Sequence, residues 1–343
     1  MNKKVIFIAD FFADLVLGGG ELNNEELIKL LIESGYQVEK CLSHTVDIEY
    51  LSNNNHFFII SNFINLKQHC RDWLRKNASY IIYEHDHKYL RSRNPATHRN
   101  FKASDSDIRN YFFYKNAKKI ICQSTFHKEI IYKNLELDNI VSVGGNLWSL
   151  ESLKTLKKLA KVEKENKCSI MSSEIPHKNT AKAIEYCKSN GLEYELVKDD
   201  NYINFLKKMG RNKTLVFFPG TPETLSRVVV EARMMGMSIK TNNLVGAVSE
   251  EWFETKGVDL INRMVEKRSE ILDLIEEETK KQHSPSPRKK ISIISSFYEA
   301  EEYLEGFLEN MTNQTIFEEC ELVIVDTGSP GREKEIIENY TKR

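Results

Sequence analysis

The sequence predicts an α/β protein with two Rossmann-like halves, followed by a short third α/β segment at the C-terminal end. Continuous apolar runs at 5–9, 80–83 and 215–218 are typical of strands buried on both faces of a parallel sheet. Amphipathic stretches lie between these runs, as crossover helices do between parallel strands. A stretch rich in Pro and Ser, 283–290, separates the last segment from the rest.

The bulk composition is that of an ordinary globular chain long enough for two or three domains, with 343 residues. The formal net charge is −1, so no broad basic field favours nucleic acid, and no nucleic-acid partner is expected. The six cysteines are scattered without a C-x-x-C pair, which favours reduced thiols and a cytoplasmic location over a disulfide framework or a zinc site. No signal-peptide pattern and no long apolar run occurs, so we expect no transmembrane span, while peripheral contact with a membrane stays open.

The first half, 1–148, opens with the strand at 5–9, a glycine run and an amphipathic helix from Glu21 that Gly35 ends. Asn23 stands where a dinucleotide fingerprint needs glycine, and no G-K-[ST] of a P-loop follows. An oxidoreductase that binds a dinucleotide is therefore a weak alternative. Further strands and helices of this half are expected at 56–61, 80–83, 116–135 and 139–148.

The second half, 149–262, should open with a crossover helix at 150–164. Its strands are expected at 168–173, 194–200 and 215–218, with a helix between the first two that ends at Gly191. We interpret Asp199 and Asp200 as a solvated turn. A charged helix, 263–281, and the Pro/Ser linker, 283–290, should follow as one connecting region, 263–290.

The most informative stretch is PETLSRVVVEARMMG, 222–236, with Glu223 and Glu231 in an E-x7-E spacing. It follows a buried strand; we expect Thr224 or Ser226 to cap a helix there and Gly236 to end it. A helix N-terminus at the carboxyl end of a parallel strand attracts anions. Carboxylates beside such a site suit a ligand with hydroxyls next to its phosphates, such as a sugar nucleotide. By spacing alone, a surface helix with two solvated glutamates is the better explanation, since such pairs are common.

This stretch resembles the donor-binding motif of the retaining GT-B glycosyltransferases, especially family 4, where an E-x7-E pair precedes a small residue and M-x-x-G. In that family the first Glu contacts the transferred sugar and the second holds the ribose hydroxyls. The resemblance covers about residues 4–260 and implies these roles for Glu223 and Glu231. The turn containing Gly19 and Gly20 is similar to the family's GGxE turn, whose amides face the donor phosphates.

The resemblance also implies a phosphate site. The amides around Thr224, Leu225 and Ser226 would contribute to it, and Lys178 stands where the family's R…KG motif has its Lys. The Arg of that motif is absent, and Ser172 and Ser173 lie near the position where the family has it. Asn179 replaces the Gly.

The sequence EHDH, 84–87, follows the strand at 80–83. Two histidines alternating with two carboxylates could bind a divalent metal, but no distant third ligand is evident in the sequence. GT-B enzymes often place a His at this strand end to face the transferred sugar, which implies that role for His85, with His87 as the second choice. A polar loop histidine is the remaining alternative. No metal and no cofactor are expected.

Residues 291–343 resemble the opening of the family 2 glycosyltransferases, which have a GT-A fold. In that family the Asp that ends the second strand binds the nucleotide base, and here it is Asp326. The second Asp of the family's DDGS motif is Thr327. The metal-binding D-x-D strand and the catalytic base of family 2 have no counterpart in this segment, so it is not expected to be an independent catalyst. We expect a fragment of a longer two-transferase protein, with a docking relic as the alternative.

Together these features predict a hexosyltransferase-like glycosyltransferase of GT-B architecture with a shortened second half, acting on a UDP- or GDP-sugar and a hydroxyl acceptor such as a glycan. Glu223 and His85 are the expected catalytic residues. Retention of configuration is implied by the resemblance and is not visible in the residues. The alternative from another class is a scaffold that keeps the fold and binds a nucleotide sugar without turnover.

Overall fold

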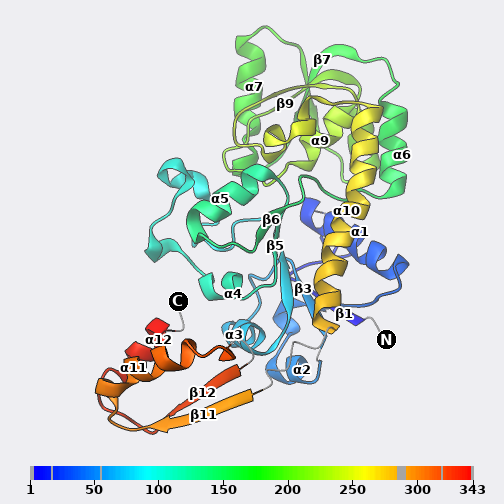
Figure 1. The fold of residues 1–343 in the computed structure, drawn as a ribbon. Helices are drawn as coiled ribbons and strands as arrows, with labels where there is room; N and C mark the ends of the chain where they lie inside the picture. The colour runs from blue at the N-terminus through cyan, green and yellow to red at the C-terminus, as the bar shows by residue number, and fades with distance from the viewer. Residues whose placement is uncertain (1–3, 17, 55, 284–290, 318–319, 341–343) are drawn as a thin grey trace. The chain divides into compact units, whose positions relative to one another are not determined.

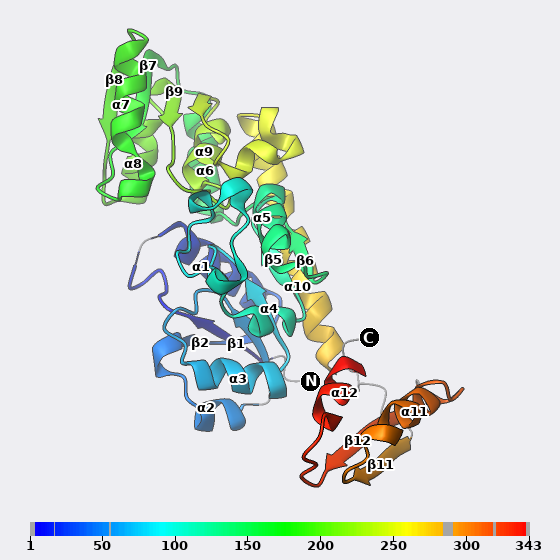
Figure 2. The same cartoon turned by 90° about the vertical axis from the view of Figure 1, so that its left-hand side faces the viewer.

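The computed structural model describes residues 4–340 apart from 17, 55, 284–290 and 318–319. It divides into two units, Met1–Lys281 and Gln282–Arg343. The first unit contains two parallel sheets (Figures 1 and 2), and the second contains one small parallel sheet. The predicted Pro/Ser linker lies almost wholly outside the described residues.

The first sheet has six parallel strands in the order β2-β1-β3-β4-β5-β6. The strands are β1 (Lys4–Ala9), β2 (Gln37–Leu42), β3 (Phe57–Ile60), β4 (Tyr80–Tyr83), β5 (Ile120–Cys122) and β6 (Ile140–Ser142). The helices of this half are α1 (Gly19–Glu33), α2 (Ile48–Ser52), α3 (Gln68–Asn77), α4 (Tyr111–Lys115) and α5 (Thr125–Leu135). Alternate residues of β1 enter two different hydrophobic cores, Ile6 and Ile8 one and Val5 and Phe7 the other, so the sheet is covered on both faces.

The second sheet has four parallel strands in the order β10-β9-β7-β8. They are β7 (Glu165–Met171), β8 (Tyr194–Val197), β9 (Asn212–Phe217) and β10 (Ser238–Thr241). The helices of this half are α6 (Leu150–Leu159), α7 (Thr180–Ser189), α8 (Tyr202–Met209) and α9 (Arg227–Met234). In the first sheet β2 and β3 lie on opposite sides of β1, and in the second β8 and β9 lie on opposite sides of β7. Such a reversal of strand order creates a crevice at the carboxyl ends of the strands, where ligands of open α/β sheets bind.

The predicted pair of Rossmann-like halves, GT-B-like and with a smaller second half, is confirmed by these two sheets. The crossover helix ends at Leu159, five residues before the predicted end at Lys164. The domain boundaries at 148 and 262 stay predictions.

Helix α9 begins differently from the prediction. Ser226 occupies the N-cap position with a φ of 75°, in the left-handed region, and its side chain makes no capping hydrogen bond. The Thr224 hydroxyl donates instead to the His85 carbonyl oxygen at 3.4 Å. The expected side-chain cap is therefore wrong, because the Ser226 backbone lies in the left-handed region and not in the extended conformation that a capping residue usually adopts. Gly236, with a φ of 80°, ends the helix as predicted.

The long helix α10 (Val258–His283) joins the two halves (Figure 1). Leu260, Ile261 and Met264, near its start, belong to the core of the second half. Further along, Ile271 and Ile275 belong to the core that also contains Val5 and Phe7 of the first half. The charged helix expected at 263–281 thus exists, and its apolar face ties the halves together.

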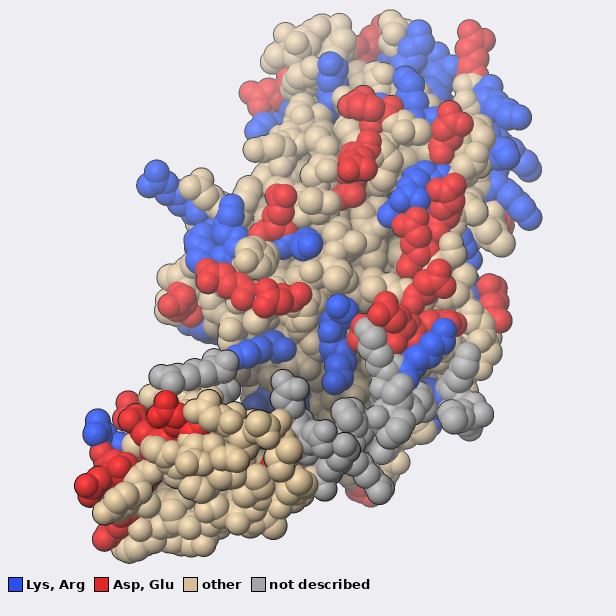
Figure 3. Space-filling view, viewed as in Figure 1, with Lys and Arg blue, Asp and Glu red and all other residues tan. Residues whose placement is uncertain are grey.

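The face of the first unit that is visible in Figure 3 carries Lys and Arg intermixed with Asp and Glu, with basic side chains gathered over α6. No broad field of one sign covers this face, in line with the formal net charge of −1. All six cysteines are free thiols. Among the described residues, no helix has the length and apolar character needed to cross a lipid bilayer.

The second unit consists of β11 (Ile291–Phe297), α11 (Glu301–Thr312), β12 (Cys320–Asp326) and α12 (Glu333–Tyr340). The two strands pair in parallel, as the predicted partial GT-A segment requires. Leu304 and Leu308 of α11 are buried, whereas Ile294 is 73% exposed on the sheet. Asp326 accepts backbone hydrogen bonds from Gly328 and Ser329 at 3.1 and 2.9 Å, which order the turn after β12.

We predict that Ile271→Ala lowers the free energy of unfolding by about 2 to 5 kcal/mol, because the buried side chain links α10 to the first-half core and its removal leaves a cavity. Urea unfolding followed by circular dichroism measures this change. Val265→Ala on the same helix is the control: Val265 is 43% exposed, so we expect a change within about 0.5 kcal/mol. Equal effects of the two substitutions would contradict the proposed packing of α10.

Candidate functional site

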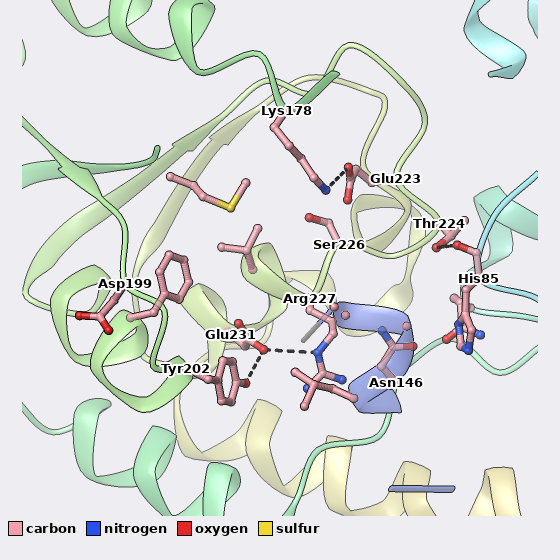
Figure 4. A pocket seen from close by; sticks show the side chains of 18 of the residues that line it. His85, Asn146, Lys178, Asp199, Tyr202, Glu223, Thr224, Ser226, Arg227 and Glu231 are labelled. Atoms are coloured by element: carbon pink, nitrogen blue, oxygen red, sulfur yellow. Dashed lines mark hydrogen bonds and ion pairs between the residues drawn. The ribbon is translucent and has the colours of Figure 1, made fainter. Parts of the chain in front are cut away.

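A cavity of about 670 Å³ lies where the carboxyl ends of strands from both halves meet (Figure 4). The start of α1, the end of β4, the start of α8 and the loop between β9 and α9 contribute to its lining. The sequence-predicted residues that line it are Gly19, Gly20, His85, Lys178, Glu223, Thr224, Ser226 and Glu231. Leu225 is fully buried in the second-half core, so at most its backbone can serve the site.

Close approach of the two halves forms this cavity. The Ser124 hydroxyl of the first half donates to the Thr224 carbonyl oxygen of the second at 2.5 Å. A Cβ on Gly246 would lie 2.3 Å from that same carbonyl oxygen and 2.4 Å from Ser124 Oγ. Only a glycine therefore fits beneath this contact. The Gly246 amide also donates to the Glu223 carbonyl at 2.9 Å, which holds the backbone of the predicted catalytic residue.

Glu231 is a buried carboxylate held by hydrogen-bond donors. Tyr202 Oη and Trp148 Nε1 donate to its Oε1 at 2.6 and 2.9 Å, and Arg227 Nε lies 3.6 Å from the same oxygen (Figure 4). Burial raises the pKa of Glu231, and Arg227 and the two hydrogen bonds oppose that rise by favouring the carboxylate. These three contacts all involve Oε1, so the carboxylate is anchored on one side and lines the pocket.

Lys178 and Glu223 form an ion pair at the opposite end of the pocket. Lys178 Nζ lies 2.7 Å from Glu223 Oε1, and the two side chains are 25% and 14% exposed. Lys178 ends a short 3-10 turn, Pro176–Lys178, and Asn179 after it adopts a left-handed conformation with a φ of 55°. Asparagine tolerates this conformation, so the Gly of the family motif is not needed here.

His85 faces the pocket as a neutral ring. Its Nε2 lies 2.8 Å from Asn24 Oδ1, and since an amide oxygen only accepts, the Nε2–H of His85 donates. Burial, and then the positive charges of Lys88 and Arg227, lower the His85 pKa to about 3. The ring is therefore uncharged at neutral pH and offers Nδ1 as an acceptor.

The other members of the EHDH segment have structural contacts away from the pocket. His87 is buried, 3.0 Å from the Tyr89 hydroxyl, and burial lowers its pKa to about 4. Glu84 is fully buried against Lys88, and Asp86 pairs with Arg93. Within the described residues, no three His, Cys, Asp or Glu side chains come together as a metal site.

Several lining residues were not expected from the sequence. Arg227 is the first residue of α9, and its Nη1 donates to the Leu147 carbonyl at 2.7 Å while its guanidinium lies 4.5 Å from the Trp148 ring centroid. A Cβ on Gly19 would lie 3.1 Å from Arg227 Cδ, so the glycine turn and this Arg are neighbours. The four-residue spacing from Arg227 to Glu231 was the one available signal, since it places both on one helix face.

The turn at Asp199 and Asp200, expected to be solvated, has an exposed Asp200, and both residues also line the pocket, which the sequence did not predict. The reason is tertiary: the turn precedes α8, whose Tyr202 reaches Glu231. Asp199 pairs with Lys208 at 2.8 Å and accepts from the Asn201 amide at 2.8 Å.

Two buried polar atoms in the lining have no hydrogen-bond partner among the described residues. They are Ser226 Oγ and Asn146 Oδ1, on side chains 6% exposed. Buried polar atoms are normally satisfied, so such atoms at a cavity wall indicate a polar ligand. Ser226 stands at the N-terminus of α9 and the glycine turn at the N-terminus of α1, where backbone amides favour anions.

Comparison with known proteins gives a match at the C-terminal end. The model of "Glycosyl transferase family 2" matches residues 292–343, which confirms the predicted family 2 segment. No curated protein matches the chain.

Solved glycosyltransferase structures resemble the chain at low sequence identity. A glycosyltransferase from Rickettsia africae ESF-5 is 13% identical with a TM-score of 0.46, covering 83% of this chain and 100% of its own. HepE from Anabaena in complex with UDP and glucose is 12% identical with a TM-score of 0.45, covering 81% and 94%. Assignments to individual residues therefore come from the geometry of this chain.

We predict that the His85 ring stays neutral between about pH 5 and 8. Burial and nearby cations lower its pKa from 6.5 to about 3, so heteronuclear NMR of the histidine rings should show the His85 ring keeping its Nε2 proton throughout this range. His85→Gln assigns the signal by removing it. A ring that titrates near its ordinary pKa and disappears in the variant would contradict the assignment.

The lowered pKa of His85 also affects how the stability of the protein depends on pH. The unfolded chain protonates His85 near pH 6.5, whereas the folded chain does so only near pH 3, so lowering the pH through this window favours unfolding. The free energy of unfolding should therefore fall less steeply below about pH 6.5 in His85→Gln than in the unaltered protein, as measured by urea unfolding at several pH values.

Proposed function

We propose that the protein is a glycosyltransferase that moves a sugar from a nucleotide-sugar donor to a hydroxyl acceptor. The observation that carries this proposal is the single cavity where Glu223, Glu231, Lys178 and His85 meet, although His85 lies far from the others in sequence. Two helix N-termini, hydroxyl-binding carboxylates and a neutral histidine in one crevice suit a ligand made of a nucleoside, phosphates and a sugar.

The proposed roles follow from the positions in the pocket. Glu231, anchored through Oε1, would bind the ribose hydroxyls with its remaining oxygen. The amides at Gly19, Gly20 and Ser226 would bind the diphosphate, together with Lys178. The backbone around Thr224 and Leu225 would complete this phosphate site.

The sugar would lie between Glu223 and His85. Glu223 would accept from a sugar hydroxyl, and the neutral His85 ring would offer Nδ1 to another. A neutral ring here avoids a charge that would attract the departing diphosphate towards the wrong end of the pocket. In a retaining reaction, the departing phosphate would itself assist the incoming acceptor hydroxyl. Stabilising the charge that develops on the leaving diphosphate is the main task for the site.

One observation favours the alternative of a non-catalytic scaffold that binds a nucleotide sugar. Lys178 is paired with Glu223, and the sequence around Ser172 and Ser173 has no Arg at the position where the resemblance implies one for the clamp. Binding without turnover would support this alternative.

We predict that one class of donor among UDP-, GDP-, ADP- and CDP-sugars raises the melting temperature, and that Glu231→Gln removes most of the rise. A ligand at about 100 times its Kd adds about 2.7 kcal/mol to stability, which a thermal-shift assay detects readily. Glutamine keeps an oxygen for Tyr202 and Trp148 but removes the charge, so the fold should survive.

Glu185→Gln is the matched control, since Glu185 is an exposed residue of α7 outside the pocket lining and loses the same charge. It should keep the full shift. Absence of a shift with every donor, from a folded sample, would refute the proposed donor site.

We predict that Glu223→Gln lowers kcat about 100-fold or more while changing the donor KM little, because a contact to the sugar made mainly in the transition state affects kcat. The measurement is transfer from the donor identified above, or its slow hydrolysis when no acceptor is known. Full turnover in this variant would contradict the role of Glu223, and donor binding without turnover in the unaltered protein would favour the scaffold.

A further inference from the structure

Arg227 lines the pocket, and none of the roles proposed for the other lining residues involves it. It is the first residue of α9, directly after Ser226, and its side chain is 10% exposed. A Cβ on Gly19 would lie 3.1 Å from Arg227 Cδ, so the side chain lies against the glycine turn at the start of α1. Arg227 is therefore a neighbour of both helix N-termini to which we assign the diphosphate.

Contacts from two other parts of the chain fix the guanidinium of Arg227. Its Nη1 donates to the Leu147 carbonyl oxygen at 2.7 Å, and its central carbon lies 4.5 Å from the Trp148 ring centroid. Its Nε lies 3.6 Å from Glu231 Oε1, one turn further along α9. A planar group held in this way loses little freedom when it binds a ligand, which favours affinity.

These contacts do not use all the N–H groups of Arg227. A guanidinium has five N–H donors. One of Nη1 serves the Leu147 carbonyl, the Nε–H faces Glu231, and the Tyr202 hydroxyl also interacts with this guanidinium. With one N–H assigned to each contact, two N–H groups still have no partner among the described residues.

A purely structural role for Arg227 would be to compensate the buried carboxylate of Glu231. Tyr202 and Trp148 already donate to Oε1 of that carboxylate at 2.6 and 2.9 Å, whereas the distance from Arg227 is longer than a hydrogen bond. Burial raises the pKa of Glu231, and the charge of Arg227 opposes that rise, so compensation is part of its role. Compensation leaves the remaining N–H groups unexplained.

An independent observation places a polar ligand beside Arg227. Ser226 Oγ is buried, on a side chain 6% exposed, and has no hydrogen-bond partner among the described residues. In Figure 4 the Ser226 side chain lies between the Lys178–Glu223 pair and Arg227. A buried hydroxyl, free backbone amides and a guanidinium fork at one place suit a group with several acceptor oxygens. Phosphate has this chemistry.

We infer that Arg227 binds the diphosphate of the nucleotide sugar and supplies the second cation of the phosphate site. This inference rests on the proposed function. The resemblance implies an Arg near Ser172 and Ser173, whereas here the first turn of α9 provides it. With Lys178 and Arg227 the described lining has two cations, so the lack of an Arg in the other loop no longer favours a scaffold without turnover.

Affinities of the full chain for nucleotides and nucleosides test this inference. Isothermal titration calorimetry identifies the best binder among UDP, GDP, ADP and CDP, and ligand-observed NMR gives the Kd of the nucleoside with the same base. In Arg227→Gln we expect the nucleotide Kd to rise at least about tenfold, because charge-assisted contacts to phosphate are lost. The nucleoside Kd should change less than about threefold, since a nucleoside has no phosphate for Arg227 to bind.

Arg227→Lys keeps a positive charge near Glu231, so the fold should survive in this variant even where glutamine destabilises it. An ammonium lacks the planar fork, and we expect the nucleotide Kd to rise about threefold or more while the nucleoside Kd stays the same. Arg211→Gln is the matched control, because Arg211 is exposed and outside the pocket lining. It should leave both Kd values unchanged.

An equal loss of nucleotide and nucleoside affinity in the Arg227 variants would assign this residue to the fold and to Glu231 alone. That result would overturn the inference, as would an unchanged nucleotide Kd, and both would leave the proposed function intact. Binding of none of the four nucleotides by the unaltered, folded protein would overturn the inference and the proposed function together.

Discussion

The rest of the first unit depends on the contacts that the buried Trp148 residue makes. It is fully buried at the junction of the halves, with its N–H on Glu231 and the Arg227 guanidinium over its ring. The backbone carbonyl of Trp148 accepts a hydrogen bond from Arg268 of α10 at 2.5 Å. The Arg268 guanidinium also lies 3.2 Å from the Glu26 carboxylate of α1. One residue thus connects the crossing helix, the first half and the carboxylate that we assign to the ribose.

This arrangement explains why a charged residue is tolerated in the interior. An unpaired buried carboxylate would be strongly destabilising, but Glu231 accepts from two neutral donors and lies near one cation. The contacts that stabilise the junction of the halves therefore also orient the site. A change at Trp148 would affect stability and donor binding together, whereas Glu223 can change with less effect on the fold because it is partly exposed.

Electrostatics distinguish this pocket from the phosphate clamp that its resemblance implies. Among the described lining residues, both cations are paired with carboxylates, and helix N-termini and the Ser226 hydroxyl, which has no hydrogen-bond partner there, add anion-binding groups. The backbone at Ser226 is left-handed and its side chain makes no capping hydrogen bond, so the first amides of α9 have no side-chain cap. The loss of a cap is a stability cost located at the proposed ligand site.

Local patterns in the sequence determined the strands, the helices and the position of the E-x7-E pair, because apolar periodicity and glycine stops act over a few residues. They also placed Glu223, Lys178 and His85 near strand ends, and parallel strands bring such ends to one edge of a sheet. The roles of Arg227, Asn146 and the turn at Asp199 were decided only by tertiary structure. Their neighbours come from distant parts of the chain: Arg227 contacts Leu147, and Tyr202 beyond the turn contacts Glu231. Partner identity and charge balance are properties of the assembled pocket, and no local pattern encodes them.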